Sequence, residues 1–145
     1  MKIKQISILD VEYIAYRLAK TLMEWDEPIP DFGTRYPHIL ESCLKVPFQT
    51  FDGKVLYKGL VEKAAILFYL MIKNHPFENG NKRIAVTTLL VFFSDNERWI
   101  DVDNQELYNF AKWVAASNPK LKDSTMKAII EFFDLHLVDL TPKSS

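Results

Sequence analysis

The chain has little of several features that define specialised protein classes. It holds one cysteine, Cys43, which excludes an internal disulfide and fits a reducing compartment. Its 19 acidic and 18 basic residues nearly balance, so no global field favours nucleic acid or an anionic membrane. The longest apolar runs, 64–72 and 84–93, fall well short of the roughly 20 residues that span a bilayer. Residues 1–10 show no signal-peptide pattern, and we expect a cytoplasmic protein.

What the chain does contain is typical of a globular domain. Its 145 residues, 48% apolar and 26% charged, can bury a core without disulfides or metals. We expect one domain over residues 1–145, without repeats or an internal linker. Apolar residues recur at helical spacing and predict about six helices. These begin and end near residues 8–25, 37–45, 59–74, 80–96, 104–114 and 124–137.

Three features of these helices can be predicted in more detail. The first helix should bury one face, made of Val11, Ile14, Leu18 and Leu22. Helix caps are expected at Ser7, Asp103 and Ser124. Core positions are expected for Cys43 and for the tryptophans Trp25, Trp99 and Trp113.

One segment favours strands over a helix. Residues 48–57 alternate around Asp52-Gly53, a dipeptide that favours a tight hairpin turn. The hairpin carries no residue suited to catalysis. We expect it to be a flap that docks an extended target segment by strand addition at its edge. The docking residues are expected to be Gln49, Thr50, Phe51, Asp52 and Gly53.

The richest chemistry lies in His75–Arg83, which reads His-Pro-Phe-Glu-Asn-Gly-Asn-Lys-Arg. This polar segment separates two apolar helices. An anion at the start of the second helix would meet free backbone N–H groups and the positive end of the helix dipole. The segment therefore predicts an anion site, with phosphate as the natural ligand.

Individual residues of this segment suggest separate roles. His75 can accept a proton near neutral pH, although a histidine that only caps the preceding helix is the simpler reading of this residue alone. Gly80 allows close approach of backbone to phosphate, or a turn that no other residue could adopt. Asn81 can donate to a phosphate oxygen, and Lys82 and Arg83 add charge. Cations in a first helical turn oppose the dipole, which makes more sense if an anion binds between them.

The same residues resemble the signature of the Fic/Doc superfamily, H-x-F-x-[D/E]-G-N-[G/K]-R. Residues 46–57 and 62–77 resemble the flap and following helix of its death-on-curing (Doc) branch, so the likeness covers roughly residues 40–93. The resemblance implies an all-α Fic/Doc domain with a short β-hairpin flap. It also implies that His75 is a general base that activates a hydroxyl of a target protein.

Two departures from the signature bear on the reaction. Nucleotidyl-transferring members usually have glycine at the position of Lys82 and a second arginine at that of Val86. At both of these positions this chain resembles the Doc branch instead. The resemblance then implies phosphoryl transfer from ATP to a Ser/Thr hydroxyl. AMP transfer by a Fic-type nucleotidyltransferase is the alternative.

The other departure is Asn79, where the family usually has Asp or Glu as a ligand of Mg²⁺. An amide oxygen carries no charge, and a hard cation prefers carboxylate, so we expect weak Mg²⁺ binding at Asn79. Asn79 could equally cap the helix that follows. A catalytically weakened binding module is therefore a further alternative.

The resemblance also implies partners. In the Doc branch the protein is the toxin of a toxin–antitoxin pair, and the modified host protein is a translation elongation factor. No segment of this chain matches the superfamily's inhibitory pattern [S/T]-x-x-x-E-[G/N]. We therefore expect inhibition in trans by a separate antitoxin chain, and neither nucleic acid nor membrane as a partner.

Overall fold

The computed structural model describes residues 2–22 and 27–140. Its first helix is continuous and consists of α1 (Ile8–Asp10), the π-helical η1 (Val11–Ala15) and α2 (Tyr16–Thr21). The predicted cap is confirmed, because the Ser7 hydroxyl accepts the Asp10 N–H at 3.1 Å while the Asp10 carboxylate accepts the Ser7 N–H. Trp25, the predicted end of the helix, lies outside the described residues.

The predicted inner face of this helix is wrong at Ile14 and Leu18, whereas Val11 is buried and Leu22 packs, partly buried, against the core. Val11, Ala15 and Ala19 are fully buried, whereas Ile14 is 45% and Leu18 38% exposed. The cause is η1, whose π-helical turn is wider than an α-helical turn. Residues four apart therefore lie on the same side of this helix, and the 3.6-residue period used in the prediction does not hold here. A second apolar row is thereby left on the outer side of the helix.

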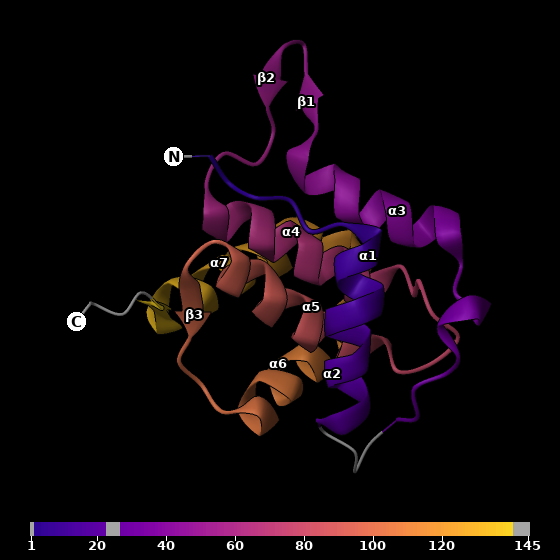
Figure 1. Ribbon diagram of the computed structural model, residues 1–145. Coiled ribbons are helices and arrows are strands. Elements are labelled where there is room, and N and C mark those ends of the chain that lie inside the picture. Colours follow the sequence, from indigo (N-terminus) through magenta and orange to yellow (C-terminus); the bar gives the residue numbers. More distant parts are fainter. Residues whose placement is uncertain (1, 23–26, 141–145) are drawn as a thin grey trace.

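The middle of the chain follows the prediction closely. After the short 3₁₀ turn η2 (Phe32–Thr34), α3 spans Pro37–Lys45, and the 3₁₀ turn η3 (Val46–Phe48) leads into the hairpin. The strands β1 (Thr50–Phe51) and β2 (Lys54–Val55) pair antiparallel, with Thr50 opposite Val55. Figure 1 shows the hairpin projecting from the helical body.

The central pair of helices is α4 (Leu60–Lys73) and α5 (Asn81–Asp95), and they form the largest contact between elements. Residues 84–93 of α5 are buried all round, as their continuous apolar character predicts. Because α5 is covered on every side, its N-terminus and the preceding loop are fixed in position. The α-helical class and the count of about six helices are confirmed.

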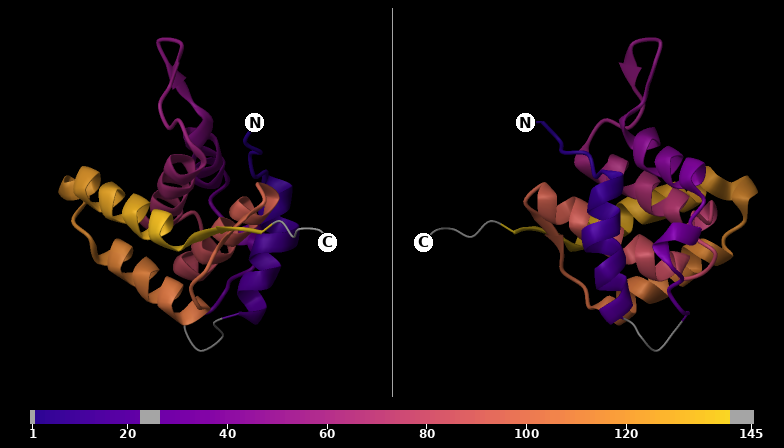
Figure 2. Two further views of the ribbon diagram at one scale, coloured as in Figure 1. Left: turned by 90° about the vertical axis from the view of Figure 1, so that its left-hand side faces the viewer. Right: turned by 45° about the vertical axis from the view of Figure 1, so that its right-hand side comes forward.

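The C-terminal part adds a two-stranded sheet that the sequence did not predict. β3 (Arg98–Ile100) precedes α6 (Asn104–Ala116), and α7 (Lys122–His136) leads into β4 (Leu137–Asp139), which pairs antiparallel with β3. Figure 2 shows β4 leaving α7 and crossing toward the N-terminal helix. Both α6 and α7 pack on α4.

The predicted caps of these two helices had different outcomes. The Asp103 carboxylate accepts the Glu106 N–H at 2.9 Å, so this cap is confirmed. The Ser124 cap is wrong, because the 3₁₀ turn η4 (Pro119–Leu121) feeds directly into α7 at Lys122. No helix in the described ranges is long and apolar enough to cross a membrane.

The predicted core holds for the cysteine but not for Trp99 and Trp113, and Trp25 lies outside the described residues. Cys43 is fully buried, and burial raises the pKa of its thiol to about 12. Trp99 is 37% and Trp113 50% exposed, so their predicted core positions are wrong. Trp99 lies on a sheet that the sequence did not predict, and Trp113 stacks on Phe110 at the outer side of α6.

Candidate active site

His75 begins the loop between α4 and α5 and is exposed to solvent. Asn74 caps α4, and the next residue, His75, has a φ of 51°. Positive φ is uncommon for non-glycine residues but is tolerated better by histidine than by most. This backbone turn ends the helix and leaves the imidazole exposed to solvent. Within residues 2–22 and 27–140 the imidazole has no hydrogen-bond partner.

The loop is held from inside by Phe77 and Asn81. Phe77 is 1% exposed, and its ring centroid lies 5.8 Å from that of Phe32. The Asn81 carboxamide accepts the Phe77 N–H and donates to the Phe77 carbonyl, both at 2.9 Å. Asn81 therefore shapes the loop, and its role as a phosphate ligand stays a prediction.

Gly80 is the N-cap of α5, and its backbone conformation needs glycine. Its φ is 72°, and a Cβ there would lie 2.7 Å from Ile29 Cδ1 and 2.8 Å from the Pro28 carbonyl oxygen. The positive φ fits the predicted turn, while the close approach of backbone to phosphate stays a prediction. The group that approaches Gly80 in this structure is the chain's own segment at residues 28–29.

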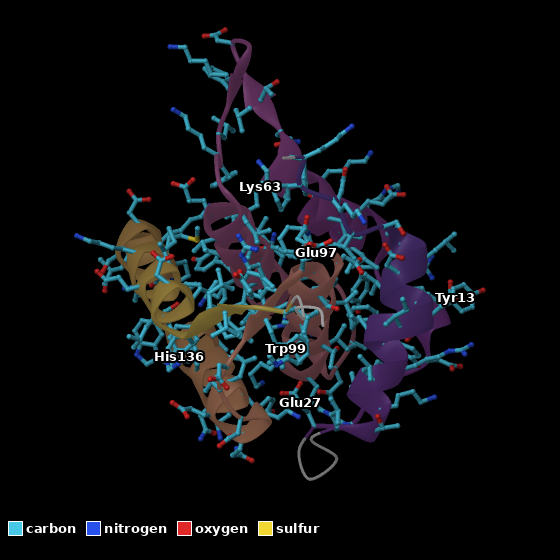
Figure 3. The ribbon with its side chains drawn as sticks, turned by 60° about the vertical axis from the view of Figure 1, so that its left-hand side comes forward. Tyr13, Glu27, Lys63, Glu97, Trp99 and His136 are labelled. Carbon is cyan, nitrogen blue, oxygen red and sulfur yellow. The ribbon has the colours of Figure 1, made fainter. Side chains whose placement is uncertain are left out.

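Glu27 supplies an anion beside the first turn of α5. Its carboxylate oxygen Oε2 lies 2.5 Å from Lys82 Nζ and accepts a hydrogen bond from the Tyr108 hydroxyl at 2.9 Å. The Glu27 side chain is only 12% exposed, and Figure 3 shows it near the lower end of α2. A carboxylate here is favoured by the dipole of α5 and by Lys82.

Arg83 is turned into the protein. It is 3% exposed, and its guanidinium donates to the carbonyls of Glu27 at 2.5 Å and Leu22 at 2.9 Å, and also to that of Ala19. These bonds fix the end of the N-terminal helix and residue 27 against α5. In this arrangement the guanidinium has no exposed fork for a bidentate phosphate contact.

Asn79 offers a poor metal ligand. Its Oδ1 accepts the Gly80 N–H at 2.8 Å, and α5 begins only at Asn81, so Asn79 precedes the N-cap instead of occupying it. No group of three or more His, Cys, Asp or Glu that could hold a metal ion occurs in the described part of the chain. The donor set therefore does not match Mg²⁺, which prefers several hard, charged oxygens.

The flap does not reach the loop of residues 74–80 in this structure. Its turn residues Asp52 and Gly53 have φ values of 53° and 73°, as a tight hairpin turn requires. Phe51 is 68% exposed at the hairpin surface. No hydrogen bond joins residues 49–55 to residues 74–80 among those described, so the flap and His75 are separate surfaces.

Glu27 and Tyr108 are the site residues that sequence reasoning missed. Glu27 pairs with Lys82 in the first turn of α5 and Tyr108 donates to Glu27, yet they lie 55 residues before and 26 residues after Lys82 in the sequence. Neither stands in a recognisable pattern. A carboxylate beside a proline-rich loop is too common in proteins to mark a site.

Comparison with known families decides the relationship of this chain. Residues 8–93, which are more than half of the sequence, match the Fic/DOC family profile. The chain belongs to the Fic/DOC family. Members of this family are typically transferases that modify proteins with nucleotide substrates. Searches of curated proteins and of solved structures gave no match.

The matched region contains most of the residues that build the site. It runs from the start of α1 through the flap to residue 93 in α5, and so includes Glu27, His75 and Lys82. Tyr108 on α6 lies beyond it. The exposed histidine and the N-terminal end of α5 both lie within the matched region and together form the candidate active site.

Proposed function

We propose that this chain is a Doc-like toxin that transfers the γ-phosphoryl group of ATP to a Ser or Thr hydroxyl of a host protein. His75 takes the hydroxyl proton, and the hydroxyl oxygen attacks the γ-phosphorus. The bond from the γ-phosphorus to the β–γ bridging oxygen breaks, and ADP leaves with that oxygen. The products are a phosphorylated protein and ADP, with the proton on His75 returned to water.

The observation that carries this proposal is the position of His75. Its exposed imidazole leads the loop that ends at the N-terminus of α5, where Lys82 stands in the first turn. A hydroxyl docked on His75 and a phosphate docked on α5 would be neighbours. Phosphoryl transfer depends mostly on such positioning and on neutralising phosphate charge.

Lys82 and Val86 favour phosphoryl over nucleotidyl transfer. Val86 is fully buried, so this position offers no cation to a second phosphate. Lys82 supplies one mobile charge, which suits a terminal phosphate facing His75. Both features resemble the Doc branch. There the nucleotide binds in the opposite orientation to that in the nucleotidyl-transferring members, so that its terminal phosphate faces the histidine.

The Glu27–Lys82 pair supports the position of the phosphate. A carboxylate and a phosphate oxygen compete for the same partners, namely an ammonium and a helix N-terminus. We infer that the terminal phosphate replaces the Glu27 carboxylate beside Lys82 when ATP binds. Mg²⁺ could reach the site with ATP, with Asn79 offering at most one neutral oxygen, and no step is assigned to it.

The proposed partners follow from the family branch. The host target would be a translation elongation factor, docked as an extended segment along the exposed flap at Gln49–Gly53. A separate antitoxin chain would inhibit in trans. The exposed Phe51 supports docking at the flap, because an extended segment on the hairpin edge would cover its ring.

A catalytically weakened binding module is the second candidate. Two observations favour it: the guanidinium of Arg83 is committed to backbone carbonyls, and the Asn79 oxygen is committed to Gly80. In this reading the loop is a stable structure that binds a partner without chemistry. His75 would then be dispensable.

Labelled ATP separates the candidates. The purified protein is incubated in cell extract with γ-³²P-ATP or with α-³²P-ATP, and proteins are resolved by electrophoresis. Phosphoryl transfer predicts a labelled band with the γ label alone. A band with the α label would replace the proposal with nucleotidyl transfer, and no band with either label would favour the binding module.

A further inference from the structure

The outer row of the N-terminal helix faces a groove instead of solvent alone. Ile14, Leu18 and Leu22 lie at intervals of four residues, opposite Leu90 and Val91 of α5 and Trp99 of β3. Together they line an open cavity of about 420 Å³. Figure 3 shows Trp99 at the centre of this face, with the N-terminal helix to its right.

Three of the apolar side chains in this groove are exposed to solvent. Ile14, Leu18 and Trp99 are 45%, 38% and 37% exposed, and all three meet in the same groove. Single exposed apolar residues are normal, but a contiguous apolar groove between two elements indicates an interaction surface.

Among the described residues, Asp95 is the single charged residue in the lining of the groove, which Ser94 and Asn104 complete. Asp95 also borders an adjoining cavity of about 670 Å³, whose charged lining residues are Lys2, Lys4, Asp10 and Asp95. Burial raises the pKa of the Asp95 carboxyl, the charge of Asp10 raises it further, and Lys4 acts in the opposite direction. An additional cation beside Asp95 would relieve the repulsion between the two carboxylates.

We propose that this groove binds an amphipathic helix of another protein, with apolar residues along the Ile14–Leu18–Leu22 row and a lysine or arginine beside Asp95. The row spans two helical turns, about 12 Å, which suits two or three apolar anchors at helical spacing. The Asp95 carboxylate, the one charge that the described part of the chain brings to the groove lining, favours a basic residue over an acidic one. This surface is independent of the chemistry proposed for His75.

The test uses a designed peptide. An alanine-rich helix with a leucine at every fourth position and one arginine in its last turn is labelled, and its binding is followed by fluorescence anisotropy. A companion peptide carries its single arginine in the first turn instead. The two peptides together allow the bound helix to run in either direction along the groove. In matched peptides, glutamate replaces arginine.

The proposal predicts that an arginine peptide binds about tenfold more tightly than its glutamate partner. Asp95→Lys should reverse this preference, and a lysine at the C-terminal end of α5 is compatible with the helix dipole. Leu18→Ser should abolish binding of all peptides. The control is Leu135→Ser, which changes a leucine that is 78% exposed on α7 and lies outside the groove.

Circular dichroism of each variant establishes that it is folded before binding is measured. Equal affinity for arginine and glutamate peptides, an unchanged preference in Asp95→Lys, or undiminished binding in Leu18→Ser would overturn the proposal. So would an absence of binding to the folded wild type. Sedimentation of the free protein as a dimer that Leu18→Ser dissociates would also overturn it, because the occupant would then be a second copy of this chain.

Discussion

The carboxylate of Glu27 lies 2.5 Å from the ammonium of Lys82 in the first turn of α5. Tyr108 donates to the same carboxylate oxygen from α6, so three elements converge on one negative charge. Helix N-termini attract anions, and this carboxylate stands where a phosphate oxygen would be favoured. The chain thus carries its own anion at the position that the proposed reaction assigns to ATP.

Replacing Glu27 with glutamine should strengthen ATP binding. Glu27→Gln removes the competing charge but keeps an oxygen that can accept from Tyr108, and the freed Lys82 then pairs with phosphate. We expect the dissociation constant for ATP, measured by calorimetry, to fall about tenfold. The free energy of unfolding should fall by about 1 kcal/mol through loss of the ion pair.

Glu131→Gln is the matched control, because Glu131 is exposed on α7, outside the candidate site. Its ATP affinity should equal that of the wild type. If Glu27→Gln binds ATP no better than this control, the phosphate does not displace the Glu27 carboxylate.

Gly80→Ala should destabilise the protein strongly. The substitution places a Cβ at a φ of 72° and within 2.8 Å of the Pro28 carbonyl oxygen, which belongs to backbone and cannot move alone. We expect the free energy of unfolding in urea to fall by about 2–4 kcal/mol. Gly33→Ala is the control, since a Cβ there meets nothing within 4 Å, and its unfolding free energy should change by less than about 1 kcal/mol. Equal stability of the two variants would contradict the close packing at Gly80.

Asn79→Asp should make nucleotide binding depend more on Mg²⁺ and raise turnover. The carboxylate would still accept the Gly80 N–H and would supply the charged hard oxygen that Mg²⁺ prefers and that Asn79 lacks. Without metal, the same charge repels phosphate. ATP titrations with Mg²⁺ and with chelator should therefore show tighter binding than wild type in Mg²⁺ and weaker binding in chelator. Identical metal dependence of both proteins would remove position 79 from the metal site.

Cys43 should be inert in the folded protein. Burial raises the pKa of its thiol to about 12, so the reactive thiolate is almost absent at neutral pH. A thiol reagent at pH 8 should modify the chain only after unfolding. The folded pKa exceeds the unfolded value of about 8.5, so ionisation of Cys43 opposes folding only above that pH, and stability should fall as pH rises further. Rapid modification of the native protein would place Cys43 outside the core.

Much of the fold could be predicted because its signals are local. Continuous apolar character predicted α5, and Asp52-Gly53 predicted the hairpin turn. The face of the N-terminal helix could not be predicted, because the π-helical segment Val11–Ala15 changes the period. The sheet of β3 and β4 was missed because its strands are three residues each and pair across a long separation.

The candidate site likewise has a part that could be predicted from the sequence and a part that could not. The motif placed His75, Gly80 and Lys82 on one loop and helix end, since all lie within a few residues of each other. The orientation of Arg83 and the position of Glu27 beside Lys82 depend on contacts between residues more than 50 positions apart in the sequence. No periodicity or local pattern encodes such contacts.

The central claim is that chemistry at His75 is the function, and growth of cells expressing the protein tests it most directly. Wild type is compared with His75→Asn, because asparagine tolerates the positive φ of this position but cannot act as a base near neutral pH. An equal unfolding midpoint for the two proteins establishes that the loop is intact. We predict that induction of the wild type arrests growth and that induction of His75→Asn at the same level does not. Equal arrest by both proteins, or growth unaffected by either, would contradict the account.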